Sequence, residues 1–318
     1  MSKTALVSGV TGQDGAYLAH LLLSKGYKVI GTSRDAEASS FSNLDKLGIK
    51  SQVTLTSMSL NDFRSVLQVI TKYEPVEIYN LAGQTSVGLS FSQPVETMES
   101  ISAGVLNLLE VVRFVNKKIR IYNAGSGEAF GDTGSEPANE EMAFRPRSPY
   151  AVAKAAGFWQ VTNYREAYDL FACTGLLFNH ESSLRPQRFV TQKIINGAKE
   201  IAVGNLKSIV LGNLDITRDW GWAPEHVEAM WMMLQTPRAD DYVIATGTSY
   251  SLEQFVEKAF EPYGLDWKKY VQVDKSFFRP LDIHVSKADP SKAKNILGWQ
   301  TKVTLNEVIK KMASGSYF

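Results

Sequence analysis

Cysteine is nearly absent from this sequence: the chain of 318 residues contains one, Cys173. A single thiol excludes an internal disulfide framework and a cysteine-ligated zinc cluster. Histidine is almost as scarce, and His20, His180, His226 and His284 show none of the i, i+4 spacing that binds zinc from one helix face. We therefore expect no bound metal.

Long apolar runs and a net charge of one sign are also missing. No apolar stretch reaches the ~20 residues that a membrane-spanning helix needs. The net charge of +1 gives no field that would attract nucleic acid or an anionic membrane. The first residues, MSKTALVSG, lead into a strand-like run without the apolar segment of a signal peptide. We expect a cytoplasmic protein whose partners include neither nucleic acid nor a membrane.

The first half of the chain alternates short β-rich runs with helical patterns, which is typical of βαβ units and a parallel sheet. The expected strands are Thr4–Ser8, Lys28–Gly31, Val53–Thr56, Val76–Leu81, Ile119–Asn123 and Ala172–Phe178. The expected helices are Tyr17–Lys25, Leu60–Lys72, Pro94–Val115 and one that starts near Pro149 with Ser148 as its cap. This pattern predicts an α/β fold with a Rossmann-type doubly wound parallel sheet.

From about Phe178 the spacing changes and the loops lengthen. Further helices are expected near Thr191–Lys199, Pro224–Leu234, Ser251–Ala259 and Leu305–Met312. We predict a dinucleotide-binding domain over residues 1–178, with later strands contributed from the second half. Residues 179–318 are expected mainly in a smaller C-terminal substrate-binding lobe interleaved with it. The run Met230–Met233 is expected in the core or an interface rather than at a cofactor.

Three glycines in GVTGQDG (Gly9, Gly12 and Gly15) follow the first expected strand and open a helix. This spacing suits a tight turn, a close backbone approach to a pyrophosphate, and a helix N-terminus that meets its negative charge. The strand before and the helix after the motif favour a dinucleotide site over an ordinary βα turn.

The end of the second expected strand predicts which dinucleotide binds. An acidic residue there would bind the ribose 2′-hydroxyl of NAD, whereas an arginine can pair with the 2′-phosphate of NADP. Arg34 therefore points to NADP, although Asp35 directly after it can repel that phosphate or neutralise Arg34.

Tyr150 and Lys154 lie four residues apart in SPYAVAK, so both project from one helix face. A tyrosine with a pKa of ~10 needs its phenolate stabilised by about 4 kcal/mol to act as a base near neutral pH. A neighbouring ammonium and a positive nicotinamide ring supply that charge. The pair then suits proton removal from an alcohol. An exposed helix face is the alternative for an isolated pair of this kind.

Ser126 and Glu128 stand at the carboxyl end of the fifth expected strand, where ligands bind in open α/β sheets. Ser126 can hydrogen-bond the same substrate oxygen as Tyr150. Oxidation of an alcohol needs no carboxylate, but elimination of water across adjacent carbons needs a base and then an acid. Glu128 therefore indicates a dehydration, with a loop salt bridge as its alternative.

With these residues the chain resembles the extended short-chain dehydrogenase/reductases and, within them, the GDP-mannose 4,6-dehydratase family. The likeness runs nearly end to end and is carried by NLAGQTSVGLSF, RPRSPYAVAKAAGFWQVTNYREAY, LLFNHES, FVTQKI and LGNLDITRDWG. It implies that Ser126 takes the place of a threonine and that Glu128, Tyr150 and Lys154 complete the catalytic set. Gly127 stands where the related dTDP-glucose dehydratases have an aspartate.

The resemblance implies a closed redox cycle on a GDP-sugar, with GDP-mannose the expected substrate. Tyr150 deprotonates the C4 hydroxyl while a hydride passes to NADP. Glu128 removes the C5 proton and protonates the departing C6 hydroxyl, and the hydride returns to C6. The product is a GDP-4-keto-6-deoxy sugar.

The resemblance also implies two sets of binding residues. The cofactor set is Gly9, Thr11, Gly12, Gln13, Asp14, Gly15, Arg34, Leu60, Leu81, Ala82, Gln84, Tyr150, Lys154 and His180. The substrate set is Ser86, Asn179, Val190, Lys193, Arg218, Arg279 and Asp282, with the two arginines on the pyrophosphate. By the same analogy, the helices near Pro94–Val115 and Tyr150–Tyr168 pair two subunits in a homodimer or homotetramer.

Several positions depart from the family pattern. Asp35 replaces a second arginine, Ser59 an aspartate expected at the adenine, and Gly83 an alanine. The loop expected over the sugar is altered at Ser183, Leu184, Pro186, Gln187 and Arg188. These changes suggest weaker cofactor binding, a dimer instead of a tetramer, or a GDP-heptose substrate. The residues also leave open a GDP-4-keto-sugar reductase or epimerase, which needs no Glu128, and a non-catalytic NADP-binding regulator.

Overall fold

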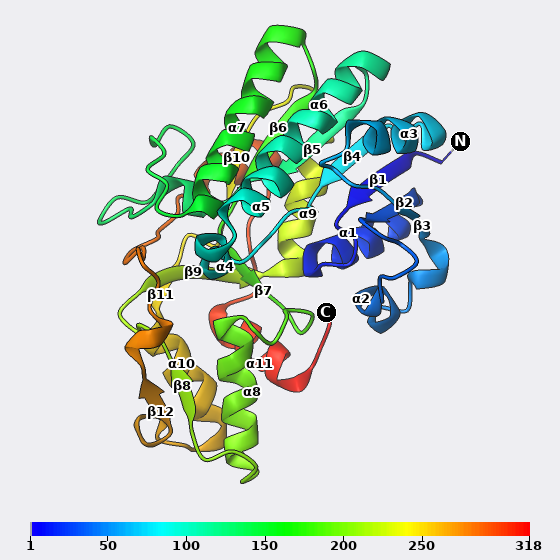
Figure 1. The fold of residues 1–318 in the computed structure, drawn as a ribbon. Helices are drawn as coiled ribbons and strands as arrows, with labels where there is room; N and C mark the ends of the chain where they lie inside the picture. Colours follow the sequence, from blue (N-terminus) through cyan, green and yellow to red (C-terminus); the bar gives the residue numbers. More distant parts are fainter. Residues whose placement is uncertain (1) are drawn as a thin grey trace.

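A seven-stranded parallel sheet forms the centre of the chain, which the computed structural model describes over residues 2–318. Its strands lie in the order β10-β6-β5-β4-β1-β2-β3 (Figure 1). They are Thr4–Ser8 (β1), Lys28–Ser33 (β2), Thr54–Ser57 (β3), Glu77–Asn80 (β4), Arg120–Ala124 (β5), Ala172–Leu177 (β6) and Tyr242–Ile244 (β10). The direction in which successive strands are added reverses between β1 and β4. This is the doubly wound arrangement, in which ligands bind in the crevice at the reversal point. The predicted Rossmann-type α/β fold is confirmed.

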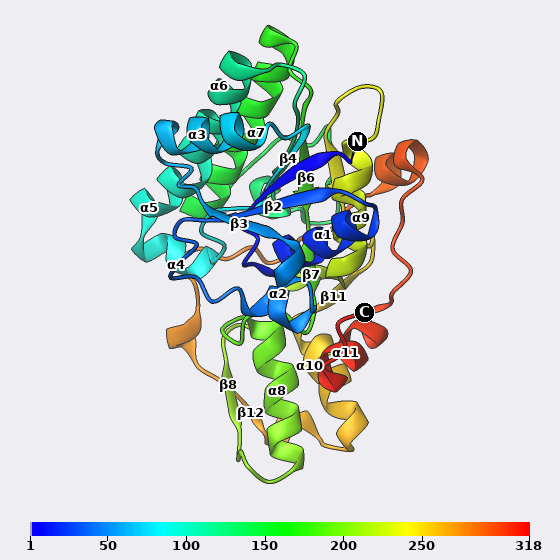
Figure 2. The same cartoon turned by 90° about the vertical axis from the view of Figure 1, so that its right-hand side faces the viewer.

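Helices cover both faces of this sheet (Figure 2). On one face lie α1 (Gln13–Ser24), α2 (Ser42–Lys46) and α9 (Ala223–Met233), and on the other lie α3 (Phe63–Tyr73), α6 (Gly104–Val115) and α7 (Pro149–Tyr168). Within β1, Ala5 and Val7 pack on the side of α1, whereas Leu6 packs with α3 and α6. A strand buried on both faces needs apolar residues at successive positions, which accounts for the run TALVS.

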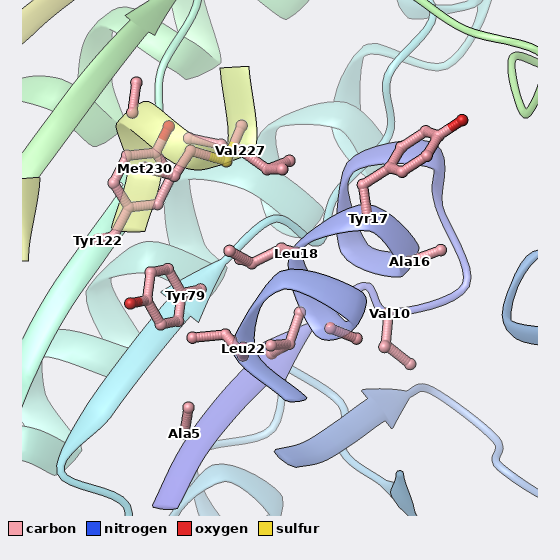
Figure 3. Packing of buried hydrophobic residues seen from close by; sticks show 14 of the residues in the cluster. Ala5, Val10, Ala16, Tyr17, Leu18, Leu22, Tyr79, Tyr122, Val227 and Met230 are labelled. Carbon is pink, nitrogen blue, oxygen red and sulfur yellow. The ribbon is translucent and has the colours of Figure 1, made fainter. Parts of the chain in front are cut away.

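The core between α1, α9 and the sheet is drawn in Figure 3. Leu18 and Leu22 of α1 meet Tyr79 and Tyr122 of the sheet, and all four side chains are buried. Met230 of α9 is fully buried in the same cluster, which agrees with the expected core position of the methionine run. This packing fixes α1, and with it the glycine turn that precedes α1, against the carboxyl end of β1.

The segment expected as one helix over Pro94–Val115 contains a π-helical turn. α5 (Pro94–Met98) leads into the turn Glu99–Ala103, and α6 follows directly. The turn brings Ser100 beside the loop after β4, where its Oγ accepts a hydrogen bond from the backbone N–H of Gln84 at 3.3 Å. That loop continues into α4 (Val87–Ser92). π turns inside α-helices frequently occur at functional sites.

The smaller lobe lies below the sheet in Figure 1 and has its own apolar cluster, with Ile194, Phe255 and Val308 at its centre. It comprises α8 (Val190–Ala202), α10 (Leu252–Phe260), α11 (Leu305–Ser314) and the parallel pair β8 (Ile209–Leu211) and β12 (Val271–Val273). A three-stranded sheet of β7 (Asn179–Glu181), β9 (Thr217–Trp222) and β11 (Ser249–Ser251) lies between the lobe and the large sheet. Short turns complete the structure at Lys50–Gln52, Gly127–Phe130, Glu261–Tyr263, Trp267–Lys269, Lys275–Phe277 and Ala293–Leu297.

The chain passes between the two units more than once. After β6 it enters the smaller lobe, returns for α9 and β10, and leaves again for β11. β10 pairs with β6 in parallel and forms an edge of the large sheet. Asp241, just before β10, accepts hydrogen bonds from Thr174 N–H at 2.6 Å and from Arg165 at 3.0 Å. These contacts fix the returning strand to α7 and β6. No helix in residues 2–318 has the length and apolar character needed to cross a membrane.

Candidate active site

Two adjoining cavities lie at the carboxyl edge of the large sheet. The first has a volume of about 640 Å³ and includes Gly9, Thr11, Gly12, Arg34, Leu60, Leu81, Ala82 and Gln84 of the expected cofactor set. The second, of about 440 Å³, is lined by all four expected catalytic residues and by all seven of the expected substrate set. Leu81 and Thr85 line both cavities. The structure therefore brings the two predicted groups together in one continuous region.

The glycine turn between β1 and α1 is built to let a ligand approach the backbone. Gly9 has φ +74°, and a Cβ there would lie 2.9 Å from the backbone N and Cα of Ala82. A Cβ on Gly15 would lie 2.3 Å from the carbonyl oxygen of Gly9, so glycine alone permits this contact between helix and turn. Gly12 is the N-cap of α1 and makes no side-chain cap hydrogen bond. The first N–H groups of α1 are thus free for a pyrophosphate, and the turn fits a dinucleotide.

Arg34 and Asp35 lie at the far end of the first cavity. The Arg34 side chain is 84% exposed and its guanidinium lies 3.4 Å from the carboxylate of Glu96. The Asp35 carboxylate accepts hydrogen bonds from the backbone N–H groups of Glu37 and Ala38 at 2.9 and 3.0 Å. Asp35 is therefore held in its own turn and forms no ion pair with Arg34. Arg34 pairs with Glu96 instead, which the sequence did not indicate.

Tyr150 and Lys154 occupy the first turns of α7, as predicted. Ser148 caps this helix by accepting a hydrogen bond from Ala151 N–H at 3.1 Å, and Pro149 takes the first position. The Lys154 Nζ donates a hydrogen bond to the carbonyl of Ala124, at the end of β5, at 2.6 Å. It lies 5.7 Å from the centre of the Tyr150 ring. The i, i+4 pair is therefore directed at the cavity and not at solvent.

Burial shifts the acidity of both groups. Desolvation raises the pKa of Tyr150 to about 12, opposed by a hydrogen bond to Ser126 and by the charge of Arg185. Desolvation lowers the pKa of Lys154 to about 8, opposed by the charge of Asp14. The protein alone thus leaves the tyrosine a weak acid, and a further positive charge is needed before it can accept a proton from an alcohol.

Ser126 and Glu128 stand on a short helical turn at the end of β5. The Ser126 Oγ accepts a hydrogen bond from the backbone N–H of Glu128 at 3.2 Å, which holds the turn closed. A Cβ on Gly127 would lie 2.8 Å from the ring of Phe178, so this position has no room for an aspartate while Phe178 stays in place. Glu128 is consequently the carboxylate that this turn presents to the cavity.

A cluster of cations surrounds the substrate end of the second cavity. Arg218 is buried, and Arg218 and Arg279 each lie 3.5 Å from the same oxygen of Asp282. Desolvation lowers the pKa of Arg218, and the charge of Glu128 opposes this effect. Lys193 lies 4.9 Å above the ring of Phe277. The remaining expected substrate residues, Ser86, Asn179 and Val190, line the same cavity.

Two expected cofactor residues, Gln13 and Gly15, do not line either cavity. The Gln13 amide donates to His180 O and to Asp14, both at 3.1 Å, and accepts from the Ser182 hydroxyl at 2.7 Å. Its side chain therefore ties α1 to β7. The Gln13 side chain thus serves this contact and not the cavities, and Gly15 serves the packing of the turn.

Sequence reasoning missed Arg185, which also lines the second cavity. Its Nε lies 3.2 Å from the buried carboxylate of Glu181, and its guanidinium lies 3.8 Å from the centre of the Phe189 ring. The sequence carried no signal for this pair, because Glu181 ends a strand and Arg185 lies in the turns that follow it. The Thr191 hydroxyl donates to the same glutamate at 2.7 Å, so Glu181 fixes the loop over the cavity.

The histidines are less scattered in space than in the sequence. His180 and His226 stack with ring centres 4.5 Å apart, and His180 lies 2.9 Å from Asp14. No group of three or more His, Cys, Asp or Glu side chains within residues 2–318 is arranged to hold a metal ion.

The chain is similar in sequence to known proteins over nearly its whole length. A family model described as GDP-mannose 4,6 dehydratase matches residues 6–312. GDP-mannose 4,6 dehydratase 1 of Arabidopsis thaliana is 44% identical over 98% of this chain and 88% of its own length. The GDP-mannose 4,6-dehydratase of Vibrio cholerae is 40% identical over 98% of this chain and 93% of its own length.

Solved structures with the same fold include two that contain NAD. A UDP-glucose 4-epimerase of Thermus thermophilus in complex with NAD gives a TM-score of 0.85 at 24% identity, covering 98% of both chains. A dTDP-glucose 4,6-dehydratase of Bacillus anthracis in complex with NAD gives 0.86 at 20% identity, covering 99% of this chain and 96% of that one. At such identities the likeness shows the fold.

Proposed function

The chain belongs to the GDP-mannose 4,6-dehydratase family, and from that premise we propose how its residues remove water from GDP-mannose to give GDP-4-keto-6-deoxymannose. One observation carries the proposal: Glu128 lines the same cavity as the Tyr150–Lys154 pair. Oxidation at C4 would require the pair alone, whereas elimination across C5 and C6 also requires a carboxylate.

The glycine turn and the first cavity would hold a nicotinamide dinucleotide, with its pyrophosphate at the free N-terminus of α1. Such a cofactor would supply the acceptor for a hydride from C4 and the donor that returns it to C6, so that no net oxidation remains. We assign NADP to the site because Arg34 is exposed and Asp35 is bound within its own turn. Separate titrations with NADP and NAD test this; Arg34→Ala should weaken NADP about tenfold and leave NAD unchanged.

Tyr150 takes the proton of the C4 hydroxyl while Ser126 hydrogen-bonds the same oxygen. The raised pKa of Tyr150, caused first by burial, makes the phenolate costly in the free protein. The positive charge of Lys154, anchored on Ala124, stabilises that phenolate during catalysis. A bound nicotinamide ring would add the further positive charge that the raised pKa of Tyr150 requires.

Glu128 then acts as base and acid in turn. Once C4 is a ketone, the C5 proton becomes acidic, and the carboxylate of Glu128 removes it. The same group, now protonated, donates to the departing C6 hydroxyl, which leaves as water. When the hydride returns to C6, C5 takes up a proton that comes from solvent. The hydrogen bond between Glu128 N–H and Ser126 keeps both residues on one short turn, which supports a shared position beside the sugar.

Arg218 and Arg279 would hold the pyrophosphate of the GDP moiety. Both guanidinium groups face Asp282, 3.5 Å from one of its oxygens. Two cations with one carboxylate leave a net positive charge for the diphosphate. Guanidinium groups bind such oxygens through paired hydrogen bonds.

We also propose a homodimer formed through α5, α6 and α7. Leu106 and Phe114 of α6 and Val152 and Trp159 of α7 are exposed apolar side chains, and Phe114 is 79% exposed. Such a surface is typical of a protein–protein contact. Light scattering after size exclusion gives the subunit number, and Trp159→Glu should shift it to the monomer.

The test of the activity uses the purified protein with catalytic NADP and GDP-mannose in deuterated water. Loss of one water, a C4 ketone, a C6 methyl group and deuterium at C5 are expected by mass spectrometry and NMR. Turnover of a GDP-heptose but not of GDP-mannose would move the substrate and keep the mechanism. Net consumption of NADPH with a 4-keto sugar, and no dehydration, would refute the proposal in favour of a reductase.

A further inference from the structure

An acidic side chain stands in the first turn of α1, where the proposed cofactor's pyrophosphate would bind. Asp14 is the second residue of that helix and lines the cavity that holds Tyr150 and Lys154. Helix N-termini favour anions because their N–H groups carry partial positive charge. A free carboxylate in the same turn would oppose a second anion, so its charge needs compensation.

His180 supplies this compensation from β7. Its Nε2 lies 2.9 Å from a carboxylate oxygen of Asp14, and its Nδ1 lies 2.7 Å from the carbonyl oxygen of Phe178. Both neighbours are acceptors, so both ring nitrogens must carry a proton to make these hydrogen bonds. With Asp14 ionised, since its pKa is lowered to about 2, despite burial, by the charge of His180 and by hydrogen bonds, this geometry favours an imidazolium, and Asp14 and His180 together are neutral.

His226 of α9 holds the imidazolium in place. The two rings stack with 21° between their planes. The Nδ1 of His226 donates to the carbonyl of Trp222 at 3.1 Å, while its Nε2 is buried without a partner within residues 2–318. A Cβ on Gly221 would lie 2.3 Å from the ring, so the backbone of β9 closes the remaining side. His226 is thus a neutral positioning residue for His180.

We propose that the Asp14–His180 pair is a charge-compensating device, set by the His226 stack, that makes cofactor binding depend on the protonation of His180. This inference rests on the proposed function only in assigning the cleft to a dinucleotide. When His180 loses its proton, the Asp14 carboxylate remains uncompensated beside the pyrophosphate and the affinity falls.

The charges around the pair determine the sign of the effect. Burial lowers the pKa of His180, but the carboxylate of Asp14 and the two hydrogen bonds raise it above its usual value. The positive charge of Arg185 lowers the pKa of His180, and Arg185 is itself paired with Glu181. Lys154 and Tyr150 of α7 line the same cavity as Asp14. The compensating charge is present below the raised pKa of His180 and is lost as the pH rises through it.

The experiment measures the dissociation constant of NADP, and separately of NAD, by calorimetry from about pH 6 to about pH 10, a range that spans histidine titration. We compare the unchanged protein with Asp14→Asn, His180→Asn, the double variant, and His284→Asn as a control on an exposed histidine. His180→Asn should weaken binding about tenfold at neutral pH, as expected for an uncompensated charge in a helix first turn. The double variant should recover most of this loss.

A second measurement reads the protonation directly. Carbon-13 NMR of the histidine Cε1 positions, assigned with the same variants, should show His180 protonated at neutral pH and His226 neutral. Asp14→Asn should return the His180 titration toward the usual range. A neutral His180 in the unchanged protein, or no coupling between the Asp14 and His180 variants, would overturn the proposal. Neither measurement requires turnover, so a failure of the dehydration assay leaves its outcome intact.

Discussion

Replacing Gly127 with alanine tests whether the packing of Phe178 holds the catalytic turn in place. The added Cβ would lie 2.8 and 2.9 Å from carbons of the Phe178 ring, whereas carbon atoms normally stay about 3.5–4.0 Å apart. Relief therefore requires a shift of about 0.7 Å. The ring has little freedom because Phe178 is buried and stacks with Phe130 at 6.2 Å.

Two quantities should change in consequence. Forced overpacking of a core costs about 1–3 kcal/mol, so the free energy of unfolding should fall by that amount. If the turn moves instead of the ring, Ser126 and Glu128 are displaced, and a shift of this size in a reacting group can reduce kcat about a hundredfold. Urea denaturation and steady-state turnover of GDP-mannose measure the two effects on the same preparations.

The controls separate packing from the loss of glycine. Gly157→Ala places its Cβ at ordinary distances of 3.5 Å or more within α7 and should leave stability unchanged or raise it by about 0.4–1 kcal/mol. Adding Phe178→Leu to Gly127→Ala should restore part of the lost activity. Normal stability and turnover in Gly127→Ala alone would refute the reasoning, because the ring would then not constrain the turn.

The remaining predictions concern single steps and the buried charges. Glu128→Gln should lower turnover by about 10²–10⁴-fold but should still accumulate the absorbance of reduced nicotinamide in a single turnover. Tyr150→Phe should show no such absorbance. Unchanged turnover in Glu128→Gln would contradict the assigned roles. Lys154→Met should abolish turnover but stabilise the fold below about pH 8. Burial lowers the pKa of Lys154 to about 8, so the protonated lysine reduces the free energy of unfolding, by up to about 3 kcal/mol. In thermal unfolding, the stability difference between variant and unchanged protein should close as the pH rises from 8 toward the usual pKa of lysine. Asp241→Ala should destabilise the protein by about 3 kcal/mol, since it leaves Arg165 without its buried partner; a loss below about 1 kcal/mol in urea unfolding would argue against that pair.

The parts of the fold that rest on local patterns could be predicted from the sequence. Apolar strands such as TALVS, the glycine turn and the i, i+4 pair of Tyr150 and Lys154 depend on neighbouring residues, and the structure has all three. Ser148 at the start of α7 belongs to the same class. Each of these signals is set by backbone geometry within a few residues.

The features that were missed depend on tertiary contacts. His180 and His226 lie on different elements, and only the packing of α9 against β7 stacks them. Arg34 meets Glu96 only because α5 approaches the end of β2. No periodicity in the sequence encodes such meetings. The hydrogen bonds that hold Asp35 in its own turn are local, but the sequence also allowed its carboxylate to neutralise Arg34.

The late position of β10 in the chain has a consequence for synthesis on the ribosome. Until Ile244 has emerged, β6 is an open edge of the large sheet, and Thr174 lacks the carboxylate that Asp241 later provides. An open edge strand is a site for pairing with other chains. The nascent protein must therefore keep the edge of its first six strands open while β7, α8, β8, β9 and α9 are translated, and transiently unpaired edges of this kind are prone to aggregation.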